Sequence, residues 1–421
     1  MDSTYRTKTE LLDKILTKAV EERQFAGVTL LWEKDGKEVA YLEKGYADLE
    51  QKRPMRRDTI FHLYSQSKPV TSAAAMLLLQ DGAIDLYDPV AKYFPSYAHQ
   101  MVQTPMGPVP ALHPMTIRDL LNMTSGLVYP GGRTQAETDT ARLFDEVLEH
   151  LGTPEAMTTE QFADRLGCCA LQFDPGTDWQ YGTSADVCGA VIEKVSGMRY
   201  GEFLRKRLFE PLGMKDTAFF VPDEKKDRLA AAYIYHSPEE VIEGAKKAAS
   251  GNYGKGQEVS QDPAEGEAWL ERYTGNNLGI RNDGGENPLE FGGAGLFSTL
   301  DDYMAFARML LAGGQSREGE QILRPGTIQF MTTHQLEDVQ QKSVRNWIGL
   351  DGHSYGNFLR VMQDQRKGGI IGHNGEYGWD GWLGTYFCND PSENQTLLMM
   401  VQRYDYGTGT VTRQVHNVVF S

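Results

Sequence analysis

Ser65-Gln66-Ser67-Lys68 stands directly before a long apolar run from Val70 to Leu79. The run holds no charged residue, and small or aliphatic side chains fill nearly every helical position, which predicts a buried helix. Residues three positions apart share one face of a helix, so we expect Lys68 to lie beside the Ser65 hydroxyl. A helix start also provides unpaired N–H groups and a positive dipole end, which favour an oxyanion.

The Ser65–Lys68 spacing has a chemical use and also a plain alternative. A serine hydroxyl becomes nucleophilic when a neighbouring base takes its proton, and a lysine amine can be that base when burial keeps it neutral. A helix-capping serine beside a lysine whose charged end reaches solvent would give the same pattern. The motif alone leaves both interpretations open.

Composition excludes several classes of protein. The chain has 421 residues, a length that suits two domains. Hydrophobic residues make up 40% of it, which is enough for a large core. A net charge of −16 argues against nucleic acid or an anionic membrane surface as a partner. With no signal-like or membrane-spanning segment, we expect a cytoplasmic protein. The four cysteines have no zinc spacing, and no motif indicates a metal or another cofactor.

The order of predicted elements suggests how the chain is organised. A helix over 8–24 and a β-hairpin around Lys34-Asp35-Gly36-Lys37 open the sequence, and helices dominate its middle. Strands over 382–389 and 395–403 and a helix from Val411 close it. We therefore predict a sheet domain from 1–85 and 290–421, with a mainly helical domain, 86–289, inserted between them. Within the insert, 237–290 is polar, Gly-rich and acidic, which predicts a surface insertion or lid.

Tyr181 is a second candidate for chemistry. It lies in Trp179-Gln180-Tyr181-Gly182-Thr183-Ser184, after a Pro-Gly turn and just before a predicted helix. A phenol between the Ser65 hydroxyl and the Lys68 amine could relay a proton, or act as the base when ionised. The alternative is a loop tyrosine that only packs.

The stretch from Gly372 to Thr385 is a third candidate, since it contains five glycines ahead of a predicted strand. Such a composition indicates a backbone that something approaches closely. An edge strand there could offer an N–H to an oxyanion, together with the N–H of Ser65. His373 could be a general acid or base, or simply a hydrogen-bonded structural residue.

Further segments match recurrent signatures of a known family: Leu86-Tyr87-Asp88-Pro89-Val90, Thr116 to Leu121 with Thr124-Ser125-Gly126-Leu127, Phe209 to Met214, and Gly292 to Thr299. Together with Ser65-x-x-Lys68, they make the chain resemble the serine β-lactamase and penicillin-binding-protein superfamily. The likeness is to its class C β-lactamase-like branch, which includes family VIII carboxylesterases. The resemblance implies an α+β fold of the β-lactamase/transpeptidase type, with an antiparallel sheet flanked by helices.

The resemblance also implies roles. Ser65 would be the acylated nucleophile, Lys68 would help to remove its proton, and Tyr181 would be the shared acid and base. The third motif of the family would be Trp379-Asp380-Gly381, which we prefer to His373-Asn374-Gly375. The second oxyanion N–H would then belong to Trp382.

Three departures from the family pattern narrow the implied activity. Thr183 stands where lactamases usually carry asparagine, and Met123 replaces a residue that is often histidine. No lysine occupies the third motif, so a substrate carboxylate lacks an anchor unless Arg403 supplies it. The resemblance thus implies a carboxylesterase acting on small-molecule esters or amides. A β-lactamase or D,D-peptidase, an acyltransferase and a non-catalytic ligand-binding relative stay open, as does the oligomeric state.

Overall fold

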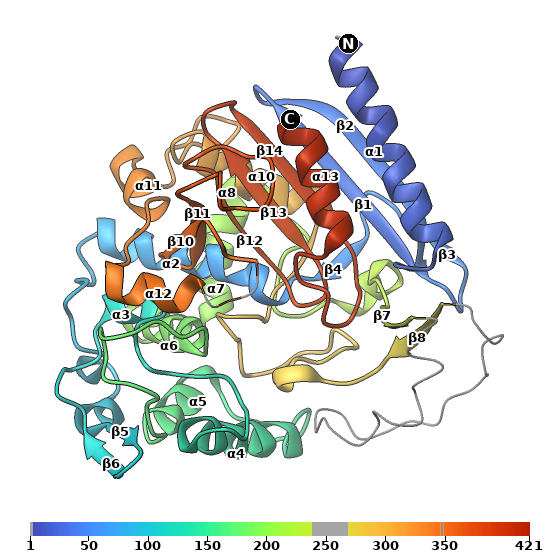
Figure 1. Cartoon of the computed structure of the whole chain (residues 1–421). Coiled ribbons are helices and arrows are strands. Elements are labelled where there is room, and N and C mark those ends of the chain that lie inside the picture. Colours follow the sequence, from blue (N-terminus) through green and yellow to red (C-terminus); the bar gives the residue numbers. More distant parts are fainter. Residues whose placement is uncertain (1–2, 238–267, 346, 348) are drawn as a thin grey trace.

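Strands from both ends of the chain pair into one eight-stranded sheet in the order β10-β11-β12-β13-β14-β1-β2-β3 (Figure 1). The computed structural model describes residues 3–237, 268–345, 347 and 349–421. All neighbouring strands are antiparallel, and β1 pairs with β14 so that Leu31 lies opposite Leu398. The predicted α+β fold, with a sheet built from both chain ends, is confirmed. The strands are β1 (Gly27–Lys34), β2 (Lys37–Asp48), β3 (Arg53–Pro54), β10 (His353–Gly356), β11 (Leu359–Met362), β12 (Tyr377–Asp380), β13 (Tyr386–Asp390) and β14 (Gln395–Met400).

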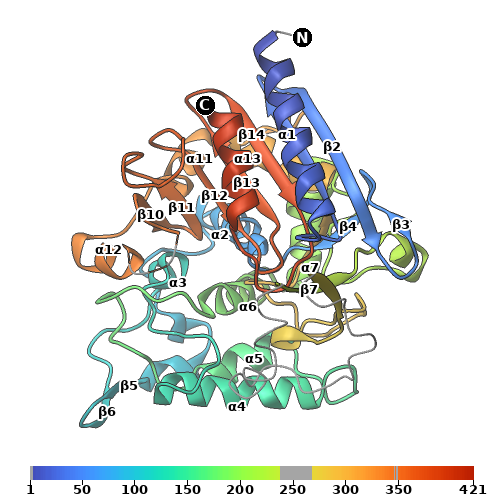
Figure 2. The same ribbon diagram turned by 45° about the vertical axis from the view of Figure 1, so that its right-hand side comes forward.

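Both faces of this sheet are buried, because strand side chains alternate between two apolar layers. Leu30 and Trp32 of β1 point into the layer beneath α1 (Ser3–Glu21) and α13 (Thr410–Phe420), which lie side by side on one face (Figures 1 and 2). Leu31 points into the other layer, with residues of α2 (Lys68–Gln80) and α10 (Leu300–Leu311). Double-sided burial explains why β1 and β14 read as nearly continuous apolar runs.

The middle of the chain forms helices, and those from α3 to α6 lie below the sheet in Figure 1. Their bounds are α3 (Ile117–Asn122), α4 (Gln135–Glu149), α5 (Thr159–Leu166), α6 (Ser184–Ser196), α7 (Tyr200–Leu204) and α8 (Glu210–Leu212). Thr116 begins α3 with a capping box, in which its side chain accepts from the Asp119 N–H and the Asp119 carboxylate accepts from the Thr116 N–H. The division of the chain into a sheet domain and a helical domain stays a prediction.

Several short elements were not predicted from the sequence. Among them are the hairpin of β5 (Met101–Thr104) and β6 (Gly107–Pro110), the pair β4 (Ile60–His62) and β9 (Phe297–Thr299), and helices α11 (Pro325–Met331) and α12 (Asp338–Arg345). They are too short to show a clear period in the sequence.

The predicted surface insertion at 237–290 falls partly outside the described residues, which omit 238–267. Its described part resumes at residue 268, and the residues that follow are packed against other parts of the protein. Strand β8 (Trp269–Tyr273) pairs with β7 (Ala232–His236), and the Trp269 ring stacks on His236 with 4.3 Å between centroids. The Tyr273 ring contacts Trp382, which brings this end of the insertion beside the third predicted motif.

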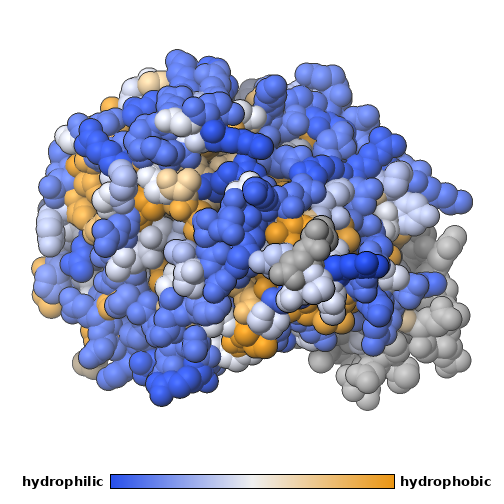
Figure 3. Space-filling view, turned by 90° about the horizontal axis from the view of Figure 1, so that it is seen from above, coloured by the Kyte–Doolittle hydropathy of each residue, from blue (hydrophilic) through white to orange (hydrophobic). Residues whose placement is uncertain are grey.

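The surface seen in Figure 3 is mostly hydrophilic, and its hydrophobic residues form separate patches. Across the described ranges, no helix combines the length and the apolar character that crossing a membrane requires. The four cysteines, Cys168, Cys169, Cys188 and Cys388, are all free thiols.

Candidate active site

Ser65 lies in a short 3₁₀ turn (Tyr64–Ser67) that continues directly into α2. Tyr64, just before it, has a left-handed backbone with φ of 46°. Such a conformation costs a residue with a side chain about 1–3 kcal/mol and persists only where the surroundings hold it. The buried Tyr64 ring packs on Trp382, with 5.1 Å between ring centroids. The chain therefore stabilises a strained turn immediately before the predicted nucleophile.

The amine of Lys68 is fully buried and directed at Ser65. Its Nζ lies 3.1 Å from Ser65 Oγ, 3.0 Å from the Tyr129 hydroxyl and 2.7 Å from the Gly293 carbonyl oxygen. Lys68 is 0% exposed, so the alternative in which its charged end reaches solvent does not describe this geometry. Burial lowers the pKa of Lys68 to about 7, against the opposing charges of Asp186 and Asp380. At neutral pH, a large fraction of Lys68 is thus an uncharged amine with a free lone pair.

Tyr181 joins Ser65 and Lys68 from the loop that leads into α6. Its hydroxyl accepts a hydrogen bond from Trp379 Nε1 at 3.0 Å and also hydrogen-bonds with Ser65. Lys68 Nζ lies 4.6 Å from the centre of the Tyr181 ring. Burial raises the pKa of Tyr181 far above its ordinary value, and the two hydrogen bonds only partly oppose this. Tyr181 is therefore a neutral phenol near pH 7, so Lys68 is the better base of the two.

Trp379, Asp380 and Gly381 lie at the end of β12, which runs close to the Ser65 turn. A Cβ on Gly381 would come within 2.2 Å of the Leu63 carbonyl oxygen, so only glycine allows this approach. The Thr385 hydroxyl donates to the same Leu63 oxygen at 3.1 Å. The next residue, Trp382, has an N–H with no hydrogen-bond acceptor in the described structure, as an oxyanion donor requires.

The expected edge strand is, in fact, an interior one, since β12 lies between β11 and β13. However, β11 pairs only with Tyr377 and Gly378 of β12. Among the described residues, the backbone of Trp379 and Asp380 has no strand partner on that side, so this half of β12 behaves as an edge towards the site. The strand order could not be deduced because β10 and β11 have four residues each.

The structure does not bring His373 to Ser65. Its Nδ1 lies 2.7 Å from Asp390 Oδ2, at the opposite end of β12 from Trp379. Thr183 is buried beside Tyr181, but its hydroxyl donates to the Val128 carbonyl at 3.3 Å. It is therefore engaged by the protein backbone.

Asp380 places a negative charge close to this group. Its Oδ2 accepts from the Thr408 hydroxyl at 2.8 Å, and its Oδ1 lies 3.8 Å from Arg360 Nη1. Arg403, the cation considered for a substrate carboxylate, has its guanidinium 4.1 Å from the centre of the Tyr235 ring and 5.0 Å from that of Tyr406. The third motif thus offers an anion where the family often has a lysine.

Three residues at the site had no assigned role in the sequence: Tyr129, Asp186 and Gly293. Tyr129 and Gly293 bind the Lys68 amine, and Asp186 Oδ1 accepts the Gly293 N–H at 2.7 Å. The segment from Gly292 to Thr299 was recognised as a signature, which was the available signal for Gly293. Tyr129 and Asp186 belong to no local pattern, because their contacts join distant parts of the chain.

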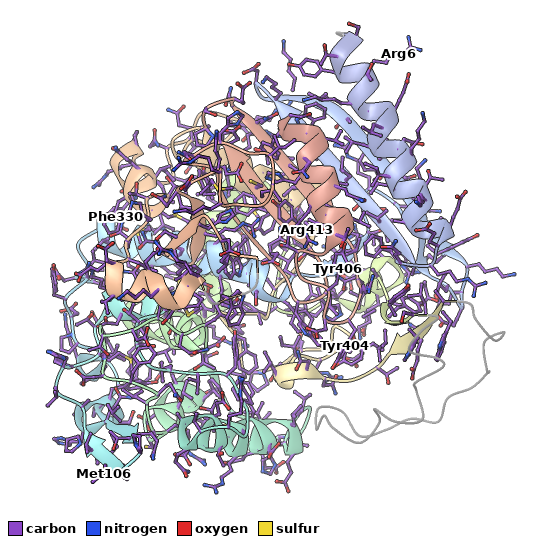
Figure 4. All side chains as sticks on the ribbon, in the orientation of Figure 1. Arg6, Met106, Phe330, Tyr404, Tyr406 and Arg413 are labelled. Atoms are coloured by element: carbon purple, nitrogen blue, oxygen red, sulfur yellow. The ribbon has the colours of Figure 1, made fainter. Side chains whose placement is uncertain are left out.

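Aromatic rings flank the site on two sides. Tyr181 contacts the rings of Tyr129, Trp347 and Trp379, with centroids 5.7, 5.1 and 5.4 Å away. On the other side, the Trp382 ring contacts the Tyr404 ring, with 4.5 Å between centroids. In Figure 4, Tyr404 lies between strand β8 and Tyr406, which is near α13. These walls suit uncharged acyl or alcohol groups.

One buried group among the described residues has donors suited to a metal ion. Atoms of Glu376, Cys388 and His416 lie within 4.8 Å of one another, and His416 Nε2 is 3.4 Å from Glu376 Oε1. Cys388 belongs to the apolar layer beneath α13, whereas Tyr181 and Trp379 belong to the opposite layer. This group is therefore separate from Ser65.

A protein-family model described as Beta-lactamase matches residues 12–416. Protein Rv1367c of Mycobacterium tuberculosis is 29% identical over 89% of this chain and 85% of its own. Esterase EstB of Burkholderia gladioli is 26% identical over 97% of this chain and 94% of its own. A similar solved structure is EstCE1, a hydrolase with promiscuous acyltransferase activity. It has a TM-score of 0.76 and 24% identity, with 99% of each chain covered.

Replacing Trp379 by phenylalanine tests the third motif. The change removes the indole N–H that binds the Tyr181 hydroxyl but keeps an aromatic ring. We expect kcat for p-nitrophenyl butyrate to fall about five- to tenfold, the value of one hydrogen bond of about 1 kcal/mol. His373→Ala is the matched control and should keep normal activity. A larger loss in the His373 variant would move the third motif to His373-Asn374-Gly375.

Proposed function

Since this chain belongs to the beta-lactamase family, it is a serine hydrolase, and we propose that it hydrolyses small uncharged esters through an acyl-enzyme on Ser65. The observation that carries the proposal is the buried Lys68 amine, 3.1 Å from the Ser65 hydroxyl. EstB, similar over nearly the whole chain, is named as an esterase, which supports the same activity.

Acylation begins with transfer of the Ser65 proton to the lone pair of neutral Lys68. The Ser65 oxygen then bonds to the ester carbonyl carbon, and the carbonyl oxygen becomes an oxyanion. The N–H groups of Ser65 and Trp382 would bind this oxyanion. When the tetrahedral intermediate collapses, the alcohol oxygen leaves and takes a proton from the Lys68 ammonium through the Tyr181 hydroxyl. The products are a free alcohol and an ester on Ser65.

Deacylation repeats these steps with water in place of the Ser65 hydroxyl. Neutral Lys68 takes a proton from the water, through the Tyr181 hydroxyl, as the water oxygen attacks the acyl carbon. The bond from the acyl carbon to Ser65 breaks, and the proton returns to Ser65. A carboxylic acid and the original enzyme result.

The charge of the site favours an uncharged ester over a β-lactam or a D,D-peptide, both of which carry a carboxylate. Asp380 would repel a carboxylate bound at the third motif, and like charges at short distance cost free energy. The Thr183 hydroxyl donates a hydrogen bond to the Val128 carbonyl oxygen, so this hydroxyl is poorly placed to hold a substrate amide. These features support the esterase over the lactamase or peptidase.

Acyl transfer to an alcohol is the second candidate, favoured by the aromatic walls and by the acyltransferase activity named for EstCE1. If an alcohol binds between these rings, benzyl alcohol should compete with water for the acyl-enzyme. Chromatography of the products from vinyl butyrate would then show benzyl butyrate above the no-enzyme level. Butyric acid alone, at every benzyl alcohol concentration, would exclude transfer to this acceptor.

We also propose that the protein works in the cytoplasm. Its four cysteines are free thiols, which are typical of a reducing compartment.

Substitution of Ser65 by alanine is the direct test of the nucleophile. We expect turnover of p-nitrophenyl acetate and butyrate to fall by roughly a thousandfold or more, since no oxygen remains to be acylated. Mass spectrometry of trapped wild-type enzyme should find the acyl group on Ser65 and none on the variant. Unchanged turnover in the variant, or wild-type enzyme with neither a burst nor an adduct from any ester, would sink the proposal.

The pH dependence of acylation should report the Lys68 amine. Its pKa is lowered to about 7, and only the neutral form can accept the Ser65 proton. We therefore expect kcat/KM to rise about tenfold per pH unit below 7 and to level off above it. Stopped-flow measurements with p-nitrophenyl butyrate, corrected for spontaneous hydrolysis, would show this rise, which is the acid limb of the pH profile. A limb near pH 10 would mean that Lys68 is not the base in its buried form.

A further inference from the structure

A buried carboxylate, Asp186, is joined to Lys68 through one residue, Gly293. Asp186 Oδ1 accepts the Gly293 N–H at 2.7 Å, and the Gly293 carbonyl oxygen accepts from Lys68 Nζ at 2.7 Å. Asp186 is 4% exposed and Lys68 0%, so water competes little for either group. The position of the carboxylate is thereby linked to that of the amine.

The segment that carries this link has no room to move away. A Cβ on Gly293 would lie 2.9 Å from Asp186 Oδ1, and one on Gly292 would lie 2.2 Å from the Ala185 carbonyl oxygen. The Thr71 hydroxyl of α2 donates to the Gly292 carbonyl at 2.5 Å. The segment is therefore clamped between α2, which carries Lys68, and α6, which carries Asp186.

The two charges also act on each other. Burial raises the pKa of the Asp186 carboxyl, and burial lowers the pKa of Lys68, while each group favours the charged form of the other. Within the described residues, the other ionisable groups that face this pair are Asp380 of β12 and three buried or half-buried tyrosines, Tyr129, Tyr181 and Tyr200. Burial raises the pKa of all three phenols, so they are neutral near pH 7. Asp186 and Asp380 are thus the anions that hold the proton on Lys68.

We propose that Asp186 is a positioning residue that holds the Lys68 amine at Ser65 through Gly293 and sets the pH at which this amine becomes a base. The inference rests on the proposed acyl transfer through Ser65. It adds a residue that touches neither the substrate nor the nucleophile, and it makes a separate, measurable claim about pH.

The test is the pH dependence of the acylation burst with p-nitrophenyl acetate in the wild type and in Asp186→Asn. Asparagine keeps an oxygen that can accept the Gly293 N–H but removes the charge that favours the Lys68 ammonium. The acid limb should therefore move to lower pH by about one unit, the scale of a nearby opposite charge. Loss of packing alone would lower the burst rate at every pH and would leave the limb in place.

Glu193→Gln is the matched control, because it makes the same change on the same helix. Glu193 accepts the Tyr200 N–H at 2.9 Å and does not contribute to the pKa shift of Lys68. The acid limb of the Glu193→Gln variant should therefore coincide with that of the wild type. Asp186→Ala removes the acceptor as well as the charge, so its plateau rate should also fall about tenfold to a hundredfold as the amine loses its anchor.

A folded Asp186→Asn enzyme with the wild-type limb would overturn the proposal and leave the Ser65 esterase intact. Wild-type enzyme without any burst would overturn the esterase, and this inference with it. Circular dichroism establishes folding. If the asparagine variant does not fold, Asp186→Ser, which also removes the charge and keeps a smaller oxygen acceptor, is judged by the same shift.

Discussion

Burial of the Lys68 amine is the constraint on which the site depends. Moving an ammonium out of water costs several kcal/mol, and the chain offsets this cost in two ways. Three oxygens accept hydrogen bonds from Nζ, and two carboxylates lie close enough to oppose the loss of its proton. The result is an amine balanced between its charged and neutral forms near neutral pH. Without this balance the Ser65 hydroxyl would have no base, since Tyr181 holds its own proton far more tightly.

The fold serves this constraint by bringing together four distant segments. The 3₁₀ turn and α2, which are continuous, supply Ser65 and Lys68, and the loop before α6 supplies Tyr181. The Gly292–Gly293 segment supplies a carbonyl, and β12 supplies the oxyanion side. Strand β12 comes from the C-terminal part of the sheet, and pairing of β14 with β1 joins that part to the N-terminal strands. A sheet built from both chain ends is therefore what places Gly381 against the turn that holds Ser65. The Glu33–Arg308 pair, at 2.9 Å, adds a polar tie between β1 and α10.

How much of the fold and the site could be predicted depended on how far apart the contacting residues lie in the sequence. Lys68 lies one helical turn from Ser65, so the local sequence was enough to place both. The hairpin at Lys34–Lys37 and most helices carried clear periodicity or turn residues. Strands β10 to β12 have four residues each, and their order follows from long-range pairing that no local pattern records. Asp186 was visible only as a position in a predicted helix, and Tyr129 only as a loop residue, because their contacts with Lys68 and Gly293 exist only in the folded chain.

The negative charge of Asp380 favours uncharged substrates at this site. A cation at this position would hold a substrate carboxylate and, by repulsion, would help to keep Lys68 neutral. An anion does the opposite, since it repels a carboxylate and favours the Lys68 ammonium. The chain reaches a neutral amine by complete burial instead, and that solution works only if the substrate brings no charge into the same space. The aromatic walls around Tyr181 and Trp382 meet this condition, because the surface that they provide is largely apolar. Substrate preference and activation of the nucleophile are thus two consequences of one electrostatic arrangement.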